Sequence, residues 1–138
     1  MISQQSLFSE EILYLNKNPN HKKIIQNANV KYNDENPSCG DSITIFAKVD
    51  KTKNILEEIS WDGKGCAISQ ASAELLCEEV SGKKIKEVMK IDSKKITEIL
   101  GLELGVVRIK CAMLPIAVLK KGIIKTFYNT NGGGKYEK

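Results

Sequence analysis

Four cysteines are the residues of this 138-residue chain best suited to chemistry, because thiolates bind soft metals and attack sulfur. Cys66 follows a glycine-rich turn, Gly63-Lys-Gly65, and begins a helical pattern in which free backbone N–H groups favour a thiolate. Cys39 and Asp41 lie two residues apart, and such side chains point the same way in an extended chain. We therefore expect Cys66 to serve metal binding or sulfur chemistry, and Cys39 with Asp41 to supply half of a metal site. The simpler alternative is a loop cysteine beside a turn aspartate.

The composition predicts one soluble globular domain over residues 1–128, followed by a flexible glycine-rich tail over residues 129–138. A net charge of +4 and an aromatic content of 6% do not indicate nucleic-acid binding. No apolar run approaches the ~20 residues that cross a bilayer, and no signal-peptide pattern is visible. We therefore expect a cytoplasmic protein without membrane contact, in which cysteines more often bind metal or catalyse than form disulfides.

A predicted β-hairpin positions these side chains. Apolar and polar residues alternate over residues 42–50 and again over residues 55–61, where Ile55, Ile59 and Trp61 share one side. The segment between the two runs is polar and typical of a turn. Antiparallel pairing places the start of one strand beside the end of its partner. We therefore expect Cys39 and Cys66 to be neighbours in space, although 27 residues separate them in the sequence.

The remaining pattern predicts helices around this hairpin. In chain order they are residues 1–17, residues 66–80, two short helices within residues 83–100, and a last helix whose first turn holds Pro115. Residues 18–38 are polar and predict a long surface loop, in which His21 is expected to be a solvated side chain. Cys77 shares an apolar stripe with Leu76 and Val80, which indicates a core residue about 16 Å from Cys66 along the helix.

The candidate site is therefore Cys39, Asp41, Cys66 and Cys111, which come from three separate segments. Around these cysteines the chain resembles the IscU/NifU/SufU family of iron–sulfur cluster assembly proteins, with a match from about Tyr32 to Lys121. The resemblance is carried by three segments: Asn36-Pro-Ser-Cys39-Gly-Asp41, Gly63-Lys-Gly-Cys66-Ala-Ile-Ser-Gln-Ala-Ser72, and Arg108-Ile-Lys-Cys111-Ala-Met-Leu-Pro115.

This resemblance implies an α+β fold of the SufE/NifU-like type, with a small antiparallel β-sheet packed against several helices. It implies that Cys39, Asp41, Cys66 and Cys111 hold zinc or an iron–sulfur cluster, of the [2Fe-2S] type in a scaffold. Cys39 and Cys111 are then candidate persulfide acceptors. The implied partners are a cysteine desulfurase, which supplies the sulfur, and apo iron–sulfur proteins, which receive the cluster.

Two functions stay open, a cluster scaffold and a zinc-dependent sulfurtransferase of the SufU type, and neither makes the chain a conventional enzyme. Lys110 stands where IscU-type members have histidine, which favours sulfur transfer. The insertion usual in SufU proteins is missing, with only 44 residues between Cys66 and Cys111, which favours the scaffold. Three thiolates and a carboxylate suit both tetrahedral zinc and an iron–sulfur cluster. A third alternative, a zinc-stabilised interaction module, is disfavoured by the three-segment match.

Overall fold

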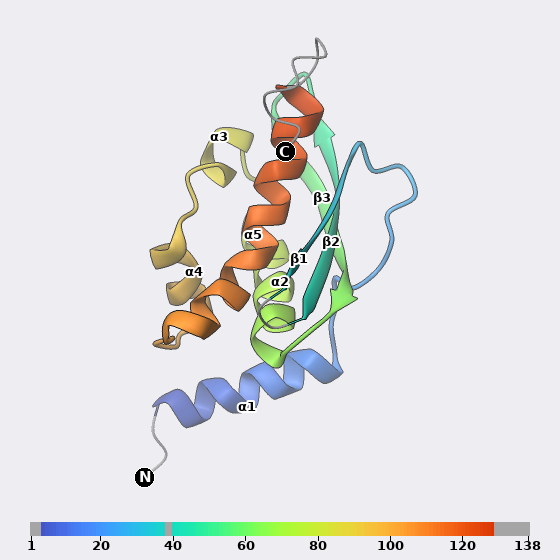
Figure 1. The fold of residues 1–138 in the computed structure, drawn as a ribbon. Coiled ribbons are helices and arrows are strands. Elements are labelled where there is room, and N and C mark those ends of the chain that lie inside the picture. The colour runs from blue at the N-terminus through green and yellow to red at the C-terminus, as the bar shows by residue number, and fades with distance from the viewer. Residues whose placement is uncertain (1–3, 38–39, 129–138) are drawn as a thin grey trace.

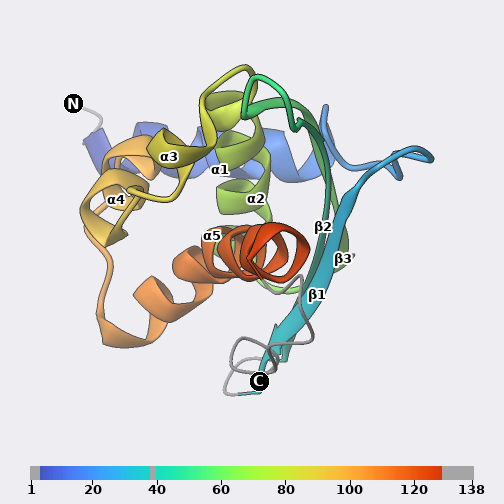
Figure 2. The same ribbon diagram turned by 90° about the horizontal axis from the view of Figure 1, so that it is seen from above.

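A three-stranded antiparallel sheet forms one side of the molecule, and the helices pack on one of its faces (Figures 1 and 2). The strands are β1 (Val30–Asn36), β2 (Asp41–Asp50) and β3 (Ile55–Lys64), in that order across the sheet. The computed structural model describes residues 4–37 and 40–128, so Cys39 and the predicted tail lie outside the described residues. The arrangement confirms the predicted α+β fold class.

The predicted hairpin is formed by β2 and β3. The apolar side of β2 is buried as predicted, with Ile43, Ile45 and Ala47 fully enclosed. A β-bulge after Lys48 shifts the pairing, so that Lys48 faces Glu58 while the next residue faces Leu56. An extra residue reverses which side chains face the core. The buried residue at the start of β3 is therefore Leu56, and Ile55 does not share the side of Ile59 and Trp61 as the alternation predicted.

The prediction of a loop over residues 18–38 is wrong for the last third of that segment, where β1 forms. This strand lies at the sheet edge and pairs only with β2 among the described residues. Its exposed positions carry polar side chains, while Val30 is fully buried and Tyr32 packs partly against the core. Gly122 of the last helix lets these two side chains approach closely, since a Cβ there would lie 2.9 Å from Val30 Cγ1. A strand with so few apolar residues carries no clear alternation in the sequence.

Five helices complete the described part of the chain. They are α1 (Gln4–Lys17), α2 (Ala67–Val80), α3 (Ile85–Val88), α4 (Ser93–Leu100) and α5 (Val106–Phe127). The first four confirm the predicted elements. By contrast, α5 begins nine residues before Pro115, so the predicted start is wrong. Proline inside a helix removes a hydrogen bond and causes a kink, and α5 changes direction along its length in Figure 1. Burial of the side chains around Pro115 offsets that cost.

Within the described residues, no helix is long and apolar enough to cross a bilayer.

The core lies between α2, α5 and the inner face of the sheet. The predicted stripe on α2 is confirmed, because Ala73, Leu76, Cys77 and Val80 are all fully buried. Burial raises the pKa of the Cys77 thiol well above its usual value, and the nearby Glu74 and Glu78 raise it further. Cys77 is therefore a neutral, packed core residue.

Replacing Cys77 with alanine is expected to lower the free energy of unfolding by roughly 1–2 kcal/mol, because it leaves a small cavity in a packed core. Metal content is expected to stay at the parent level, since this thiol faces the core. Denaturant unfolding and elemental analysis measure the two quantities. A variant that folds normally but loses its metal would show that Cys77 belongs to the site.

His21 is not the solvated side chain that the sequence predicted. Residues 21–23 run beside β3, where Trp61 N donates to His21 O at 2.9 Å and Lys23 N donates to Trp61 O at 3.0 Å. The side chain of His21 contacts Glu74 of α2, with 2.5 Å between Nδ1 and Oε2. The two residues are 53 positions apart, so no local pattern in the sequence links them.

Candidate metal centre

The start of β2, the start of α2 and the first part of α5 meet at one end of the molecule, the lower end in Figure 1. They bring together Asp41, Cys66 and Cys111, whose candidate ligand atoms all lie within 4.8 Å of one another. Asp41 and Cys111 are buried, whereas Cys66 is exposed. Cys39, the fourth predicted ligand, lies outside the described residues and is two positions from Asp41 in the chain.

The carboxylate of Asp41 ties the hairpin to the start of α2. Its Oδ1 accepts a hydrogen bond from Cys66 N at 2.9 Å, and Cys66 is the N-cap residue of this helix. Its Oδ2 lies 3.6 Å from Cys66 Sγ. Ser69 supports the same turn, because its Oγ donates to Cys66 O at 3.1 Å. Asp41 thus has a structural contact through one oxygen and presents the other oxygen to the sulfur.

Gly65 makes this close approach possible. Its φ is +158°, and a Cβ at this position would lie 2.4 Å from Asp41 Oδ1 and 2.7 Å from Ser69 Oγ. A side chain is also excluded at Gly63, since a Cβ there would lie 2.1 Å from the carbonyl oxygen of Ser42. The two glycines therefore let the backbone of β3 pass directly against the start of β2.

Gly65→Ala is expected to reduce the amount of tightly bound metal, because the added methyl group displaces the Asp41 carboxylate from Cys66. Metal content after gel filtration, measured together with the melting temperature, tests this. Gly105→Ala is the matched control, since a Cβ at Gly105 meets no atom within 4 Å. If Gly65→Ala retains metal as firmly as the parent and the control, the carboxylate is not required where it lies.

Cys111 comes from α5 and is only 3% exposed. Because α5 begins before this cysteine, Cys111 is part of the helix and does not precede it as the sequence predicted. Ser72 of α2 donates a hydrogen bond to the carbonyl oxygen of Ala112 at 2.6 Å, which joins the two helices next to the thiol. The spacing between Cys66 and Cys111 is therefore set by helix packing.

A mainly apolar cavity of about 380 Å³ opens beside Cys66. Its walls come from α1, the first turn of α2 and residues 102–104, with Glu103 and Arg108 as its charged members. Leu13, which lines the cavity, is 58% exposed, and Val106, two residues before Arg108, is 78% exposed. Large apolar side chains that stay exposed next to one another are typical of a surface that another protein covers.

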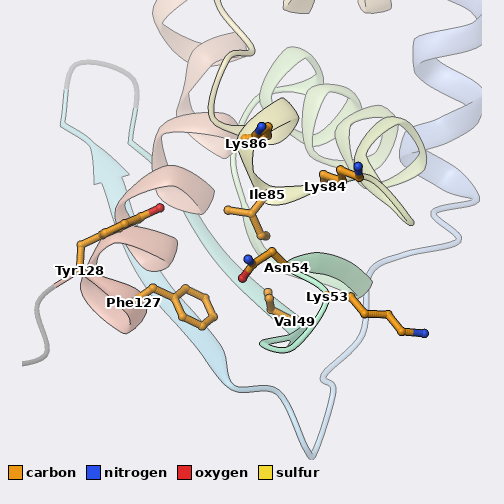
Figure 3. A pocket seen from close by; sticks show the side chains of 8 residues that line it. All are labelled: Val49, Lys53, Asn54, Lys84, Ile85, Lys86, Phe127 and Tyr128. Carbon is orange, nitrogen blue, oxygen red and sulfur yellow. The ribbon is translucent and has the colours of Figure 1, made fainter.

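A larger cavity than the one beside Cys66 lies elsewhere, and no cysteine lines it. It measures about 580 Å³ and is shown in Figure 3. Its walls are formed by the β2–β3 turn, α3 and the end of α5, including the rings of Phe127 and Tyr128. The amino group of Lys53 points away from these rings. The thiols therefore identify the chemical site better than cavity size does.

The donor set fits a metal centre. Two thiolates and a carboxylate, joined by the predicted thiolate of Cys39, are the ligands that zinc and iron–sulfur clusters accept. Lys64, Arg108 and Lys110 are exposed and flank the ligands in the sequence. Their positive charges oppose the excess negative charge of such a site.

The fold and the site define a class of small α+β domains that gather cysteines and an aspartate at one end of a sheet. Within that class, the sequence profile of the NifU-like N-terminal domain matches residues 7–132, and the chain belongs to this family.

Relatives of known name agree with this assignment. The zinc-dependent sulfurtransferase SufU of Bacillus subtilis (strain 168) is 31% identical, over 87% of this chain and 91% of its own length. The iron–sulfur cluster assembly scaffold protein IscU of Thermotoga maritima is 27% identical, over 86% of this chain and 94% of its own length.

The fold is shared with solved structures. The SUF-system protein SufU of Fervidobacterium islandicum AW-1 superimposes with a TM-score of 0.72 at 27% identity, covering 88% of this chain and 99% of that one. The N-terminal part of a NifU-like protein from Brucella abortus has the same fold at 15% identity, with a TM-score of 0.72 and coverage of 93% and 99%.

Proposed function

We propose that this chain is an iron–sulfur cluster assembly protein that binds metal or a cluster through Cys39, Asp41, Cys66 and Cys111. The observation that carries the proposal is the meeting of Asp41, Cys66 and Cys111 within 4.8 Å, from three segments far apart in the sequence. Membership of the NifU-like family and relatives named as cluster scaffolds support it. In this role the chain receives sulfur from a cysteine desulfurase and passes clusters to apo iron–sulfur proteins.

A second candidate is a zinc-dependent sulfurtransferase that relays persulfide sulfur. The 31% identity to a Bacillus subtilis protein of that name favours it, as does Lys110 before the last cysteine. In this case zinc occupies the same residues and holds the thiolates in place. In the scaffold the bound group is a cluster of the [2Fe-2S] type. Either way the reduced thiols require a reducing compartment, and we propose the cytoplasm.

Cys39 and Cys111 are the proposed persulfide acceptors. A persulfide passes between proteins when a thiolate attacks the outer sulfur and displaces the donor's thiolate. The attacking group must therefore be accessible, and Cys111 is only 3% exposed. This burial argues against Cys111 as the first acceptor, so Cys111 is reached only after the site opens.

A desulfurase assay tests the proposal. The purified chain is incubated without oxygen with a cysteine desulfurase of the same organism and cysteine. We expect faster turnover, together with a mass increase of one sulfur atom on the chain. Adding ferrous iron together with a thiol reductant, which reduces the persulfide sulfur to sulfide, is expected to produce the visible absorbance of a cluster if the chain is a scaffold, and none if it is a zinc sulfurtransferase. Failure to stimulate the desulfurase and to form a cluster would exclude both functions.

A further inference from the structure

A second group of metal-ligating side chains lies further along α2, outside the thiolate site. His21, Glu74 and Glu78 each present one candidate ligand atom, and these atoms all lie within 4.8 Å of one another. One imidazole nitrogen with two carboxylate oxygens is a donor set that suits Mn²⁺, Fe²⁺ or Zn²⁺. We propose that this trio binds one divalent first-row transition metal ion.

Glu74 is the oriented ligand of the three. It is fully buried, and its Oε1 accepts hydrogen bonds from His21 N at 2.9 Å and from Trp61 Nε1 at 3.1 Å. Its Oε2 faces His21 Nδ1 at 2.5 Å. One oxygen is therefore held by two N–H donors, while the other is presented to the imidazole. Metal-binding carboxylates are commonly oriented by such outer hydrogen bonds.

Burial raises the pKa of Glu74, but the hydrogen bonds from His21 and Trp61 outweigh it and leave the pKa below its usual value. The carboxylate is thus charged at neutral pH, as a ligand must be.

Glu78 completes the trio from the solvent side. It lies one helical turn after Glu74, a spacing that puts both carboxylates on the same face of α2. Glu78 is exposed and makes no hydrogen bond or ion pair with any described residue. An arriving ion takes the place of the hydrogen bond between His21 Nδ1 and Glu74 Oε2, with the imidazole bound as its neutral Nε2–H tautomer, and water fills the remaining coordination positions.

The two sites are separate. Glu74 follows Cys66 by eight helical residues, which corresponds to about 12 Å along α2. Their chemistry also differs, because the thiolates select soft ions whereas the carboxylates accept harder ones. The proposed ion site at His21, Glu74 and Glu78 therefore does not depend on the proposed function of the thiolate site.

Manganese binding to the full chain tests this site. Mn²⁺ prefers oxygen donors, so it is added to protein already loaded with zinc at the thiolates. Electron paramagnetic resonance counts the free Mn²⁺, and proton resonances of the ring report contact, because His21 is the only histidine of the chain. We expect one Mn²⁺ per chain at saturation and selective broadening of the His21 ring signals.

Two variants and a matched control make the test specific. Glu78→Gln changes an exposed residue and is expected to abolish the saturable binding and the broadening. Trp61→Phe removes a hydrogen bond to Glu74 and is expected to weaken binding about 10–100-fold. Glu98→Gln removes one exposed glutamate from α4 and is expected to bind Mn²⁺ like the parent.

The proposal is overturned if Mn²⁺ shows no saturable binding, or if Glu78→Gln and the parent bind it equally. His21 and Glu74 then form an ion pair only. Zinc content of the same samples reports on the thiolate site, so failure of one site does not obscure the other.

Discussion

Cys66→Ser is expected to reduce tightly bound metal from about one equivalent per chain to a small fraction of it. The sulfur of Cys66 lies 3.6 Å from Asp41 Oδ2 and within 4.8 Å of Cys111 Sγ, so it is close to both of the other proposed ligands that the structure describes. A serine hydroxyl keeps the size of the side chain but not the soft thiolate that zinc and iron prefer. Elemental analysis of protein purified without oxygen measures the loss.

The fold of this variant should survive, because Cys66 is exposed and contributes little to the core. Cys111→Ser is expected to lose metal to the same extent. Cys77→Ala is the matched control, since it removes a thiol from the same helix as Cys66 but from the core side. Full metal content in Cys66→Ser, at the level of this control, would refute the proposed site.

Asp41→Asn is expected to change the release of the bound group instead of its binding. An oxygen ligand holds a soft metal less firmly than sulfur, so the carboxylate is the ligand expected to exchange. In a scaffold, a cluster held by the three thiolates is expected to stay longer on the variant. In a zinc sulfurtransferase, zinc is expected to remain while stimulation of the desulfurase falls. Cluster absorbance over time and desulfurase turnover separate the two functions.

Comparison with Asp41→Ala separates exchange from structure. Asparagine can still accept the hydrogen bond from Cys66 N, whereas alanine leaves that partly buried donor without this partner. We expect alanine to cost about 1–3 kcal/mol of unfolding free energy beyond asparagine. If Asp41→Asn behaves like the parent in both assays, Asp41 is only a structural residue at the start of α2. The site then has three protein ligands and an open position.

Local patterns in the sequence were sufficient for the hairpin, for α2 and for the short helices. Alternation in β2 and the stripe around Cys77 repeat with the period of their own element, so each segment reports its own structure. The neighbourhood of Asp41 and Cys66 followed as well, because antiparallel pairing joins the two ends of a hairpin. The three cysteine segments were sufficient for the family.

Tertiary contacts decided the rest. Strand β1 is polar and forms because it completes the sheet edge under α5. Helix α5 continues through Pro115 because the residues on both sides of the proline, Ala112 and Ile116 among them, are buried. The bulge that brings Leu56 into the core arises from the pairing of two strands. The contact between His21 and Glu74 joins residues 53 positions apart. The place of the Asp41 carboxylate beside Cys66 depends on the absence of a Cβ at Gly65. These features depend on partners distant in the chain, and no period within a single segment encodes them.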